Sequence, residues 1–393
     1  MKKVLLFLRE NSIAPKGGPS GYVFNLLKGL PESESISISL LPPAPTNSKK
    51  RKWYDSLPVW IKRIYRVYGH YKEYRHLSQG YEDVTEEYLA QFDAVHFHSC
   101  LSLYAHLNVL KNYNGLVFLT SHSPKPPHIE MIEDFYSKFE RFLYGKKHLK
   151  KYEKAVIAAY ERADAIIYPC KEAEESYYNN WNKYVDIRKR IEQKIFFLPT
   201  GVDSCKEKVA LTRDEVCEKY NIPKDAFIVA FVGRHNEVKG YDLLKSIASH
   251  FTEESNVYFL IAGEESPLKR PKLSYWKEAG WTKDPYSIES AADLFILPNK
   301  ETYFDLVLLE VLSIGTPVLT TYTGGNKFFA KFDSEIYYFT KIEEAVETIE
   351  KMKNKECSGK NRTLFLNHFT AKKFGENYIS TLDNIFLINN KQS

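Results

Sequence analysis

Cysteine is scarce in this sequence, and its placement excludes the chemistry that clustered cysteines carry. The five residues are odd in number and widely separated: Cys100, Cys170, Cys205, Cys217 and Cys357. No pair has the spacing of a zinc site, and the pattern does not read as a disulfide framework. We therefore expect reduced structural thiols, no metal site, and a cytoplasmic protein.

Long hydrophobic runs are also missing. The first apolar run, residues 4–8, has only five residues, whereas the apolar region of a signal peptide has about 7–15. No later run approaches the roughly 20 apolar residues of a transmembrane helix. We expect neither a signal peptide nor a membrane-spanning segment.

The length of 393 residues exceeds that of one ordinary hydrophobic core and fits two domains. The net charge is +5, and the excess lies in the first half, where residues 1–205 carry 30 Lys and Arg against 23 Asp and Glu. Two halves start alike, since residues 3–8 and 226–232 are apolar strands, each followed by a glycine-containing loop and a helix. Alternating strands and helices predict parallel sheets covered on both faces.

Residues 291–326 are the most informative segment. They read as a strand, a polar loop, a helix over about 305–314, the turn Gly315-Thr316-Pro317, and a second strand. Glu310 lies in the middle of a helix that is otherwise apolar on nearly every side, and a carboxylate in such a place needs hydrogen-bond partners. The polar loop faces a helix N-terminus, which favours anions. Together these features predict a ligand with anionic and hydroxyl groups, such as a nucleotide sugar.

Two further loops can hold phosphate. Arg234 and Lys239 stand five residues apart at a strand-to-helix turn, where a guanidinium fork and an ammonium suit a diphosphate. Gly17 and Gly18 precede the first helix and would let backbone amides approach a phosphate, although such loops are often only turns.

Three histidines follow buried strands. His122 stands just past the strand 115–120, at the end of a parallel strand where ligands bind. His96 and His98 are two residues apart, so the pleat turns both to one face. They lack a third metal ligand at useful spacing, and we interpret them as structural or as part of the acceptor side.

The order of these motifs resembles the metal-independent, retaining glycosyltransferases with the GT-B fold. Glu310, Gly315, Thr316, Pro317 and Val318 match the family signature, and the segment GRHNEVKG matches its diphosphate loop. The resemblance implies an α/β chain of two Rossmann-like domains facing each other across a cleft. Residues 1–203 would form the acceptor-side domain and 204–368 the nucleotide-sugar domain, with a C-terminal helix in 369–393 returning to the first.

The resemblance further implies transfer of a sugar from a nucleotide diphosphate sugar, with UDP as the expected carrier, to a hydroxyl of a glycan or lipid-linked glycan in cell-surface polysaccharide synthesis. No cofactor or metal is implied. The residues at the reacting centre would be His122, Arg234, Lys239 and Glu301. Contacts with the donor would come from Gly17, Gly18, Arg234, Lys239, Gly263, Thr302, Tyr303, Phe304, Asp305, Leu306 and Glu310.

The chain departs from the family signature at two points. Eight residues separate Glu301 from Glu310 where the family has seven between its two glutamates, and Thr302 holds the family's spacing. Asp305 stands where the family has glycine. These departures leave two alternatives open, a non-catalytic partner subunit that keeps the fold and a GT-B-like phosphorylase or epimerase.

Two basic stretches are rich in aromatic residues. Residues 49–75 contain nine Lys and Arg against Asp55 and Glu73, with Trp53 and Trp60 among them, and residues 138–154 add further lysines. Such stretches suit an anionic membrane surface, nucleic acid, or simply a solvated helix face. No nucleic-acid-binding motif accompanies them, so we favour attachment to the inner face of the cell membrane over nucleic acid.

Overall fold

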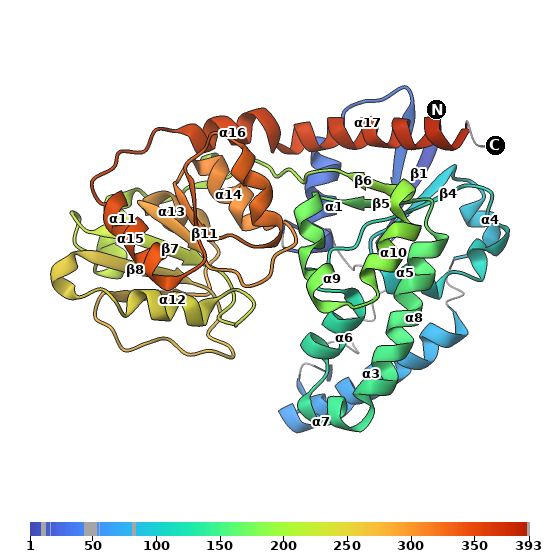
Figure 1. Cartoon of the computed structure of the whole chain (residues 1–393), viewed down its shortest axis with the longest axis horizontal. Coiled ribbons are helices and arrows are strands. Elements are labelled where there is room, and N and C mark those ends of the chain that lie inside the picture. Colours follow the sequence, from blue (N-terminus) through green and yellow to red (C-terminus); the bar gives the residue numbers. More distant parts are fainter. Residues whose placement is uncertain (9–12, 16, 43–52, 55, 81–83, 391–393) are drawn as a thin grey trace.

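The computed structural model describes residues 1–8, 13–15, 17–42, 53–54, 56–80 and 84–390, which form two domains side by side (Figure 1). Both are built on a six-stranded parallel sheet, so the expected α/β architecture is confirmed. The first sheet has the order β2-β1-β3-β4-β5-β6 and the second the order β12-β11-β10-β7-β8-β9. In each, strand order reverses beside the first strand of the domain, which is where ligands bind in open parallel sheets.

The first domain alternates strands with covering helices. Its strands are β1 (Lys2–Phe7), β2 (Ile36–Leu40), β3 (Ala94–Phe97), β4 (Leu116–Leu119), β5 (Ala165–Tyr168) and β6 (Ile195–Phe197). Its longer helices are α1 (Pro19–Gly29), α3 (Val59–Gln79), α5 (Cys100–Ala105), α6 (Pro127–Phe135), α8 (Lys146–Arg162), α9 (Glu175–Asn180) and α10 (Tyr184–Arg190), with short helices α4 (Glu86–Leu89) and α7 (Lys138–Glu140).

The second domain repeats the plan. Its strands are β7 (Phe227–Val232), β8 (Val257–Ala262), β9 (Trp276–Gly280), β10 (Leu294–Leu297), β11 (Val318–Thr321) and β12 (Ile336–Phe339). Its helices are α11 (Arg213–Tyr220), α12 (Tyr241–Ala248), α13 (Pro285–Ala291), α14 (Leu306–Ile314), α15 (Ile342–Met352) and α16 (Lys360–His368), followed by α17 (Ala371–Asn390).

The central strands are apolar on both faces because helices cover both sides of each sheet. In β1, Leu5 and Phe7 pack into one core and Val4 and Leu6 into the other, and all four are almost fully buried. Alternate residues of a strand point to opposite faces, so a doubly covered strand must be apolar throughout. This is why such strands appear in the sequence as unbroken hydrophobic runs.

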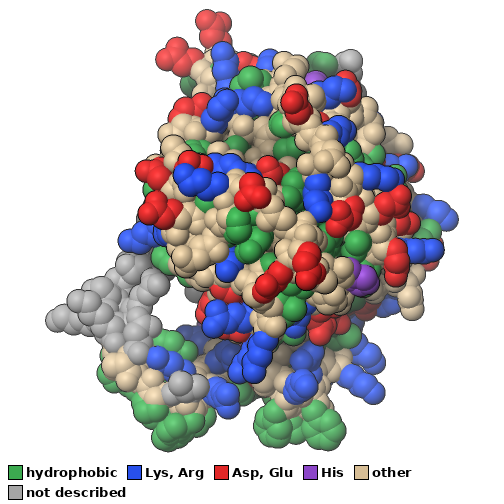
Figure 2. All heavy atoms as spheres, turned by 90° about the vertical axis from the view of Figure 1, so that its left-hand side faces the viewer, with side chains coloured by type: hydrophobic (Ala, Val, Ile, Leu, Met, Phe, Trp, Pro, Cys, Tyr) green, Lys and Arg blue, Asp and Glu red, His purple; other side chains and the backbone are tan. Residues whose placement is uncertain are grey.

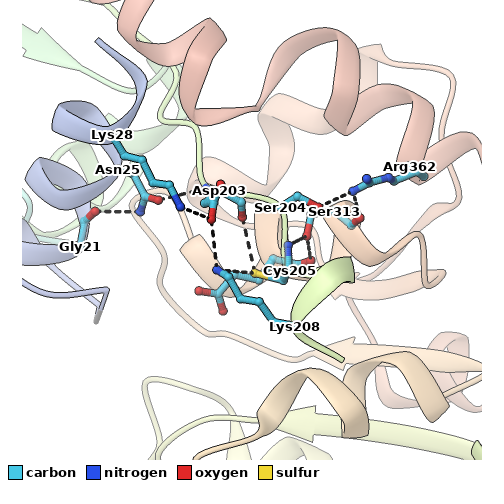
Figure 3. A network of polar contacts seen from close by, with 10 residues as sticks. Gly21, Asn25, Lys28, Asp203, Ser204, Cys205, Lys208, Ser313 and Arg362 are labelled. Carbon is cyan, nitrogen blue, oxygen red and sulfur yellow. Dashed lines mark hydrogen bonds and ion pairs between the residues drawn. The ribbon is translucent and has the colours of Figure 1, made fainter. Parts of the chain in front are cut away.

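The connection between the domains is fixed by polar contacts rather than left as a loose linker (Figure 3). Asp203 accepts hydrogen bonds from Lys28 of α1 at 2.6 Å, and its backbone amide donates to the Asn25 side chain at 3.0 Å. Lys208, further along the connection, lies 3.5 Å from the same Asp203 carboxylate. The amide of Cys205, two residues after Asp203, donates to the Ser313 hydroxyl of the second domain at 2.9 Å. The connection therefore carries anchors from both domains.

Helix α17 crosses from the second domain and runs along the first (Figure 1). It packs on α1, and Tyr378 shares a hydrogen bond of 2.8 Å with His96 of β3. Two glycines allow the close crossing, because a Cβ on Gly29 would lie 1.7 Å from the carbonyl oxygen of Ala371, and one on Gly375 would lie 2.0 Å from that of Gly29. The C-terminal helix thus joins the core of the first domain.

The crossing predicts a specific loss of stability. Replacing Gly375 with Ala should lower the free energy of unfolding by about 1–3 kcal/mol, because the added methyl overlaps the Gly29 carbonyl and forces the helices apart. Gly69→Ala is the matched control, since a Cβ there meets open space and alanine is favoured over glycine inside a helix by roughly 0.5–1 kcal/mol. Urea unfolding measures both variants, and a Gly375→Ala midpoint at or above that of the parent chain would contradict the crossing.

Candidate functional site

An ion pair between Asp305 and Lys239 lies at the N-terminus of α14 in the second domain. Asp305 caps the helix by accepting from the Val307 amide at 3.2 Å, and its other oxygen accepts from Lys239 at 2.6 Å and from Asn299 at 2.7 Å. Burial by itself would raise the pKa of Asp305, but Lys239 and these hydrogen bonds outweigh it and lower the pKa. The ammonium of Lys239 is therefore fixed beside the first turn of α14.

The loop that carries Arg234 and Lys239 is pinned to its surroundings by close backbone contacts. Gly240, with φ of 66°, begins α12, and a Cβ there would lie 1.7 Å from the Pro298 carbonyl oxygen. A Cβ on Gly263 would lie 1.8 Å from the carbonyl oxygen of Gly233. Gly263, expected from the resemblance to contact the donor, thus has a packing role in this structure. The side chain of Arg234 is exposed.

Glu310 lies partly buried one turn into α14. Burial and the charge of Asp305 raise its pKa to about 7, against the opposing effect of Lys208 and Lys239. In the described part of the chain, no side chain donates a hydrogen bond to this carboxylate. The unmet acceptor capacity predicted from the sequence is therefore present in the structure.

Glu289 of α13 is a second carboxyl group near Glu310, and no motif or spacing indicated it. Its side chain is fully buried, and neither oxygen has a hydrogen-bond partner among the described residues. Burial and the charge of Glu310 raise its pKa well above the usual range. Burial therefore disfavours the charged form of this carboxyl group.

The loop after β4 faces the second domain across the cleft. Lys125 lies 3.8 Å from Glu301 of the second domain and 2.9 Å from Glu133 of α6. Burial raises the pKa of Glu301, and one of its oxygens has no hydrogen-bond partner within the described chain. Glu301 is therefore at the domain interface, in place to meet a ligand that lies between the domains.

Glu130 is another cleft residue that sequence reasoning missed. It stands in the first turn of α6, where Ser123 donates a short hydrogen bond to its carboxylate. Burial raises its pKa to about 7, while Arg234, which belongs to the other domain, acts to lower it. Arg234 is therefore close enough to the first domain to influence the charge of Glu130. An acidic residue in the first turn of a helix after Pro126-Pro127 was the only signal in the sequence.

The histidines form a buried stack at the carboxyl ends of β3 and β4. The rings of His98 and His122 share a hydrogen bond of 3.0 Å, and the His96 and His98 ring centroids are 4.4 Å apart. Burial lowers the pKa of both His96 and His122 to about 3. His96 also bonds Thr120 at 2.8 Å. His96 is therefore structural, whereas His122 ends the stack as a neutral imidazole.

The glycine loop lies next to this stack. Gly18, with φ of 76°, begins α1, and a Cβ on Gly17 or Gly18 would meet open space. Tyr22, in the first turn of α1, places its ring 4.8 Å from that of His122. The loop and the imidazole thus share one end of the first sheet. Lys16, in the same loop, lies outside the described residues.

The loop before α14 contributes more to packing than the resemblance implied. Phe304 is buried and stacks against Phe329, with ring centroids 5.3 Å apart. Tyr303 lies against Tyr168 of the first domain, and its hydroxyl is buried without a partner among the described atoms. Thr302 is also buried, and its carbonyl accepts from the Gly325 amide at 3.2 Å. Leu306, the first residue of α14, packs partly buried against the same core.

Comparison with known proteins identifies the architecture. Residues 16–204 match the family described as "Glycosyltransferase Family 4", and residues 212–364 match the family described as "Glycosyl transferases group 1". The two matches leave only the ends of the chain and the connection 205–211 uncovered. The chain belongs to the group 1 glycosyltransferases of the GT-B fold.

Solved structures share this fold over nearly the whole chain. Sucrose-phosphate synthase from Thermosynechococcus elongatus superposes with a TM-score of 0.63 at 17% identity, covering 99% of this chain and 100% of that one. The Anabaena protein HepE, solved with UDP-glucose, gives a TM-score of 0.63 at 13% identity, covering 98% and 100%. At these identities the likeness concerns the fold.

Curated relatives from Escherichia coli match part of the chain. An O-antigen biosynthesis glycosyltransferase is 25% identical over 230 residues, which is 52% of this chain and 62% of the relative. A UDP-Gal:alpha-D-GlcNAc-diphosphoundecaprenol alpha-1,3-galactosyltransferase is 25% identical over 171 residues, covering 40% of this chain and 44% of that protein. The chain is thus matched to less than two thirds of either relative.

Two negative findings concern only the described residues. No three His, Cys, Asp or Glu side chains among them lie close enough together to hold a metal ion. No helix in the described ranges, α3 and α17 included, combines the length and apolarity needed to cross a bilayer.

The ion pair at α14 predicts that Lys239 supports the fold as well as the site. Lys239→Ala should lower the free energy of unfolding by about 1–3 kcal/mol, because it leaves the buried Asp305 carboxylate without its cation. Asp305→Asn in the same chain should recover most of that loss, since asparagine also caps helices and carries no charge. Urea unfolding of the two single variants and the double variant measures the coupling, and additive effects would show that the pair is not the cause.

Proposed function

We propose that the protein transfers a sugar from a nucleoside diphosphate sugar to a hydroxyl group of a glycan or lipid-linked glycan. The observation that carries the proposal is the ammonium of Lys239 beside the N-terminus of α14, with Arg234 exposed on the same loop. Two cations and a helix N-terminus form a site for a diphosphate that gains one negative charge as it leaves. The cations take the place that a divalent metal has in other diphosphate sites, so we propose a metal-independent reaction.

The groups around this site suit the rest of a nucleotide sugar. Glu310 can accept hydrogen bonds from the ribose hydroxyls once it is ionised, which fits its unmet acceptor capacity. His122, a neutral imidazole, and Glu301, which faces the cleft, would contact the donor sugar from the two domains. The backbone amides near Gly17 and Gly18 would approach from the first domain, where the space beside both glycines is open.

We propose that the anomeric configuration of the sugar is retained. In this reaction the bond between the anomeric carbon and the leaving phosphate oxygen breaks, and the acceptor hydroxyl attacks on the same face. The leaving phosphate oxygen then takes the hydroxyl proton, so the protein supplies no nucleophile. Glu130, facing Arg234 across the cleft, has a pKa raised to about 7 and so adds less than a full negative charge beside the diphosphate.

We infer UDP as the carrier and a cell-surface polysaccharide as the product. The support comes from the named relatives, because one acts on a diphosphoundecaprenol acceptor with UDP-Gal and another belongs to O-antigen biosynthesis. HepE, which shares the fold, was solved with UDP-glucose. A lipid-linked acceptor would place this protein in the cytoplasm, at the inner face of the cell membrane.

Replacing Arg234 tests the diphosphate assignment without disturbing the core. Arg234→Ala should lower kcat by about 10²–10³, or roughly 2.7–4 kcal/mol of transition-state stabilisation, because it removes one charge-assisted contact to the leaving group. The side chain is exposed, so the unfolding midpoint should not change. Product release from a panel of UDP-sugars, measured with EDTA present, is the assay.

A matched control is Lys351→Ala, which removes an exposed cation from α15 of the second domain. It should leave kcat within about twofold. Turnover by Arg234→Ala equal to that of the parent chain would refute the diphosphate assignment, and loss of activity in EDTA would refute metal independence.

The raised pKa of Glu310 predicts how nucleotide binding depends on pH. Only the ionised carboxylate can accept both ribose hydroxyls, and with a pKa of about 7 the ionised fraction rises about tenfold from pH 6 to pH 8. UDP affinity should rise by a similar factor over that range. Glu310→Gln should bind UDP more weakly and keep only the pH dependence of the nucleotide itself. Calorimetric titration of both proteins measures this, and parallel pH profiles would make Glu310 structural.

A further inference from the structure

Two segments of the first domain project away from its sheet and end side by side. One is α3, and the other is the continuous helical run formed by α7, the π-helical turn Arg141–Gly145 and the first turn of α8. In Figure 1 both extend below the rest of the domain. We call the exposed ends of these two segments, residues 60–71 and 138–147, the tip.

The tip is held as a rigid unit by a stack of rings between the two segments. His70 of α3 lies 4.6 Å from the Tyr136 ring and 2.7 Å from the Glu140 carboxylate. One turn further along, Tyr74 stacks on His148 at 3.8 Å. These contacts bury the inner sides of both segments. On the outer sides, Trp60, Tyr68, Phe139 and Phe142 are exposed among the described residues.

Large apolar side chains cover the outer side of the tip. Phe142 is 86% exposed and Phe139 68% exposed on the helical run, while Trp60 is 64% and Tyr68 61% exposed on α3. Figure 2 shows hydrophobic side chains gathered at the lower end of the molecule, below a group of Lys and Arg. Apolar groups so exposed on a rigid support are characteristic of surfaces that bind something.

The charge of the tip has one sign. Residues 138–147 carry four Lys and Arg against a single acid, Glu140, which is buried and engaged by Ser137 and His70. On α3, Arg63 and Arg66 are exposed and form no ion pair with a described acid. The partner of this surface must therefore present negative charge beside apolar material.

A groove between the two segments combines both features. Its volume is about 990 Å³, and Arg63, Arg66, Tyr71, Phe139 and Lys147 are among its lining residues. Aromatic walls with cations at the rim suit a phospholipid headgroup whose acyl chains continue into the apolar region. Anionic bilayers offer this combination continuously, since phosphate lies directly above hydrocarbon.

We propose that the tip docks onto a bilayer of anionic phospholipid, with Phe139 and Phe142 entering the interface and Arg63, Arg66 and Lys147 binding headgroup phosphates. The surface takes residues 60–71 from the stretch 49–75 favoured from sequence, of which residues 49–52 lie outside the described chain. Phe142, the most exposed aromatic side chain among the described residues, comes from the stretch 138–154. The proposal deepens the proposed function, on which its biological meaning rests, by bringing the enzyme to the surface where a lipid-linked acceptor is held.

Vesicle co-sedimentation tests the docking without any sugar transfer. The parent chain should sediment with vesicles of phosphatidylglycerol and phosphatidylcholine at low salt, far less with phosphatidylcholine alone, and less at 0.5 M salt because screening shortens the reach of the cations. Phe139→Ser with Phe142→Ser should weaken binding at least tenfold. Arg63→Ser, Arg66→Ser and Lys147→Ser together should do the same.

Matched controls remove equal groups elsewhere. Trp281→Ser removes an aromatic side chain that is 71% exposed in the second domain, and the triple variant of Lys224, Lys351 and Lys372 to Ser removes three exposed cations. Both should bind vesicles like the parent chain. UDP binding by every tip variant, followed by thermal shift, shows whether the donor site is intact, so a failed docking and a failed donor assignment give different results.

Three outcomes would overturn the proposal. They are no sedimentation of the parent chain with anionic vesicles at low salt, tip variants that bind like the parent, and equal loss in the control variants. Sedimentation equilibrium without lipid distinguishes membrane docking from self-association of the chain through the tip. A parent dimer that the phenylalanine variants convert to monomer, with no vesicle binding, would assign the tip to self-association instead.

Discussion

The Asp305 carboxylate holds the Lys239 ammonium at 2.6 Å, and the diphosphate site that we propose is arranged around this ion pair. The same carboxylate caps α14, so one residue fixes both the cation and the helix N-terminus. The pair also explains why an acid can stand where the family has glycine. Asp305 is buried and bonded on both oxygens, so its charge is directed at Lys239 and the helix amides rather than at an incoming phosphate.

Four glutamates near the proposed site have one property in common. The pKa values of Glu130, Glu301, Glu310 and Glu289 are all raised, with burial as the largest cause in each case. A raised pKa lowers the negative charge that such carboxyl groups carry at a given pH, and the exposed Arg234 keeps its attraction for a diphosphate. Burial thus reconciles an acid-rich cleft with an anionic ligand. Hydroxyl donors of the proposed ligand would favour the ionised form of Glu310.

The sequence predicts the inner strands well and the outer ones poorly. β5, β8, β10 and β11 have the bounds that their apolar runs suggest, because a strand covered on both faces must be apolar throughout. The strands it does not reveal are β2, β9 and β12, and all three are edge strands. They are only partly buried, as in the alternating Ile-Ser pattern of β2, and so carry no continuous hydrophobic signal.

The site divides along a similar line. Groups within one motif, such as Arg234, Lys239 and Glu310, can be predicted because local spacing places them at strand and helix ends. Lys125 and Glu130 could not be predicted, because they interact with residues of the other domain. Glu289 could not be predicted either, because its spacing in the sequence does not reveal its burial. The role of Asp305 depends on a contact across 66 residues of sequence.

The central claim is that the cleft binds a nucleoside diphosphate through Arg234, Lys239 and the first turn of α14. A crystal structure of the chain with UDP tests it most directly. The account predicts the diphosphate within hydrogen-bond distance of both cations and of the α14 backbone amides, with the ribose hydroxyls on Glu310. A nucleotide bound elsewhere, or a diphosphate that contacts neither cation, would contradict it.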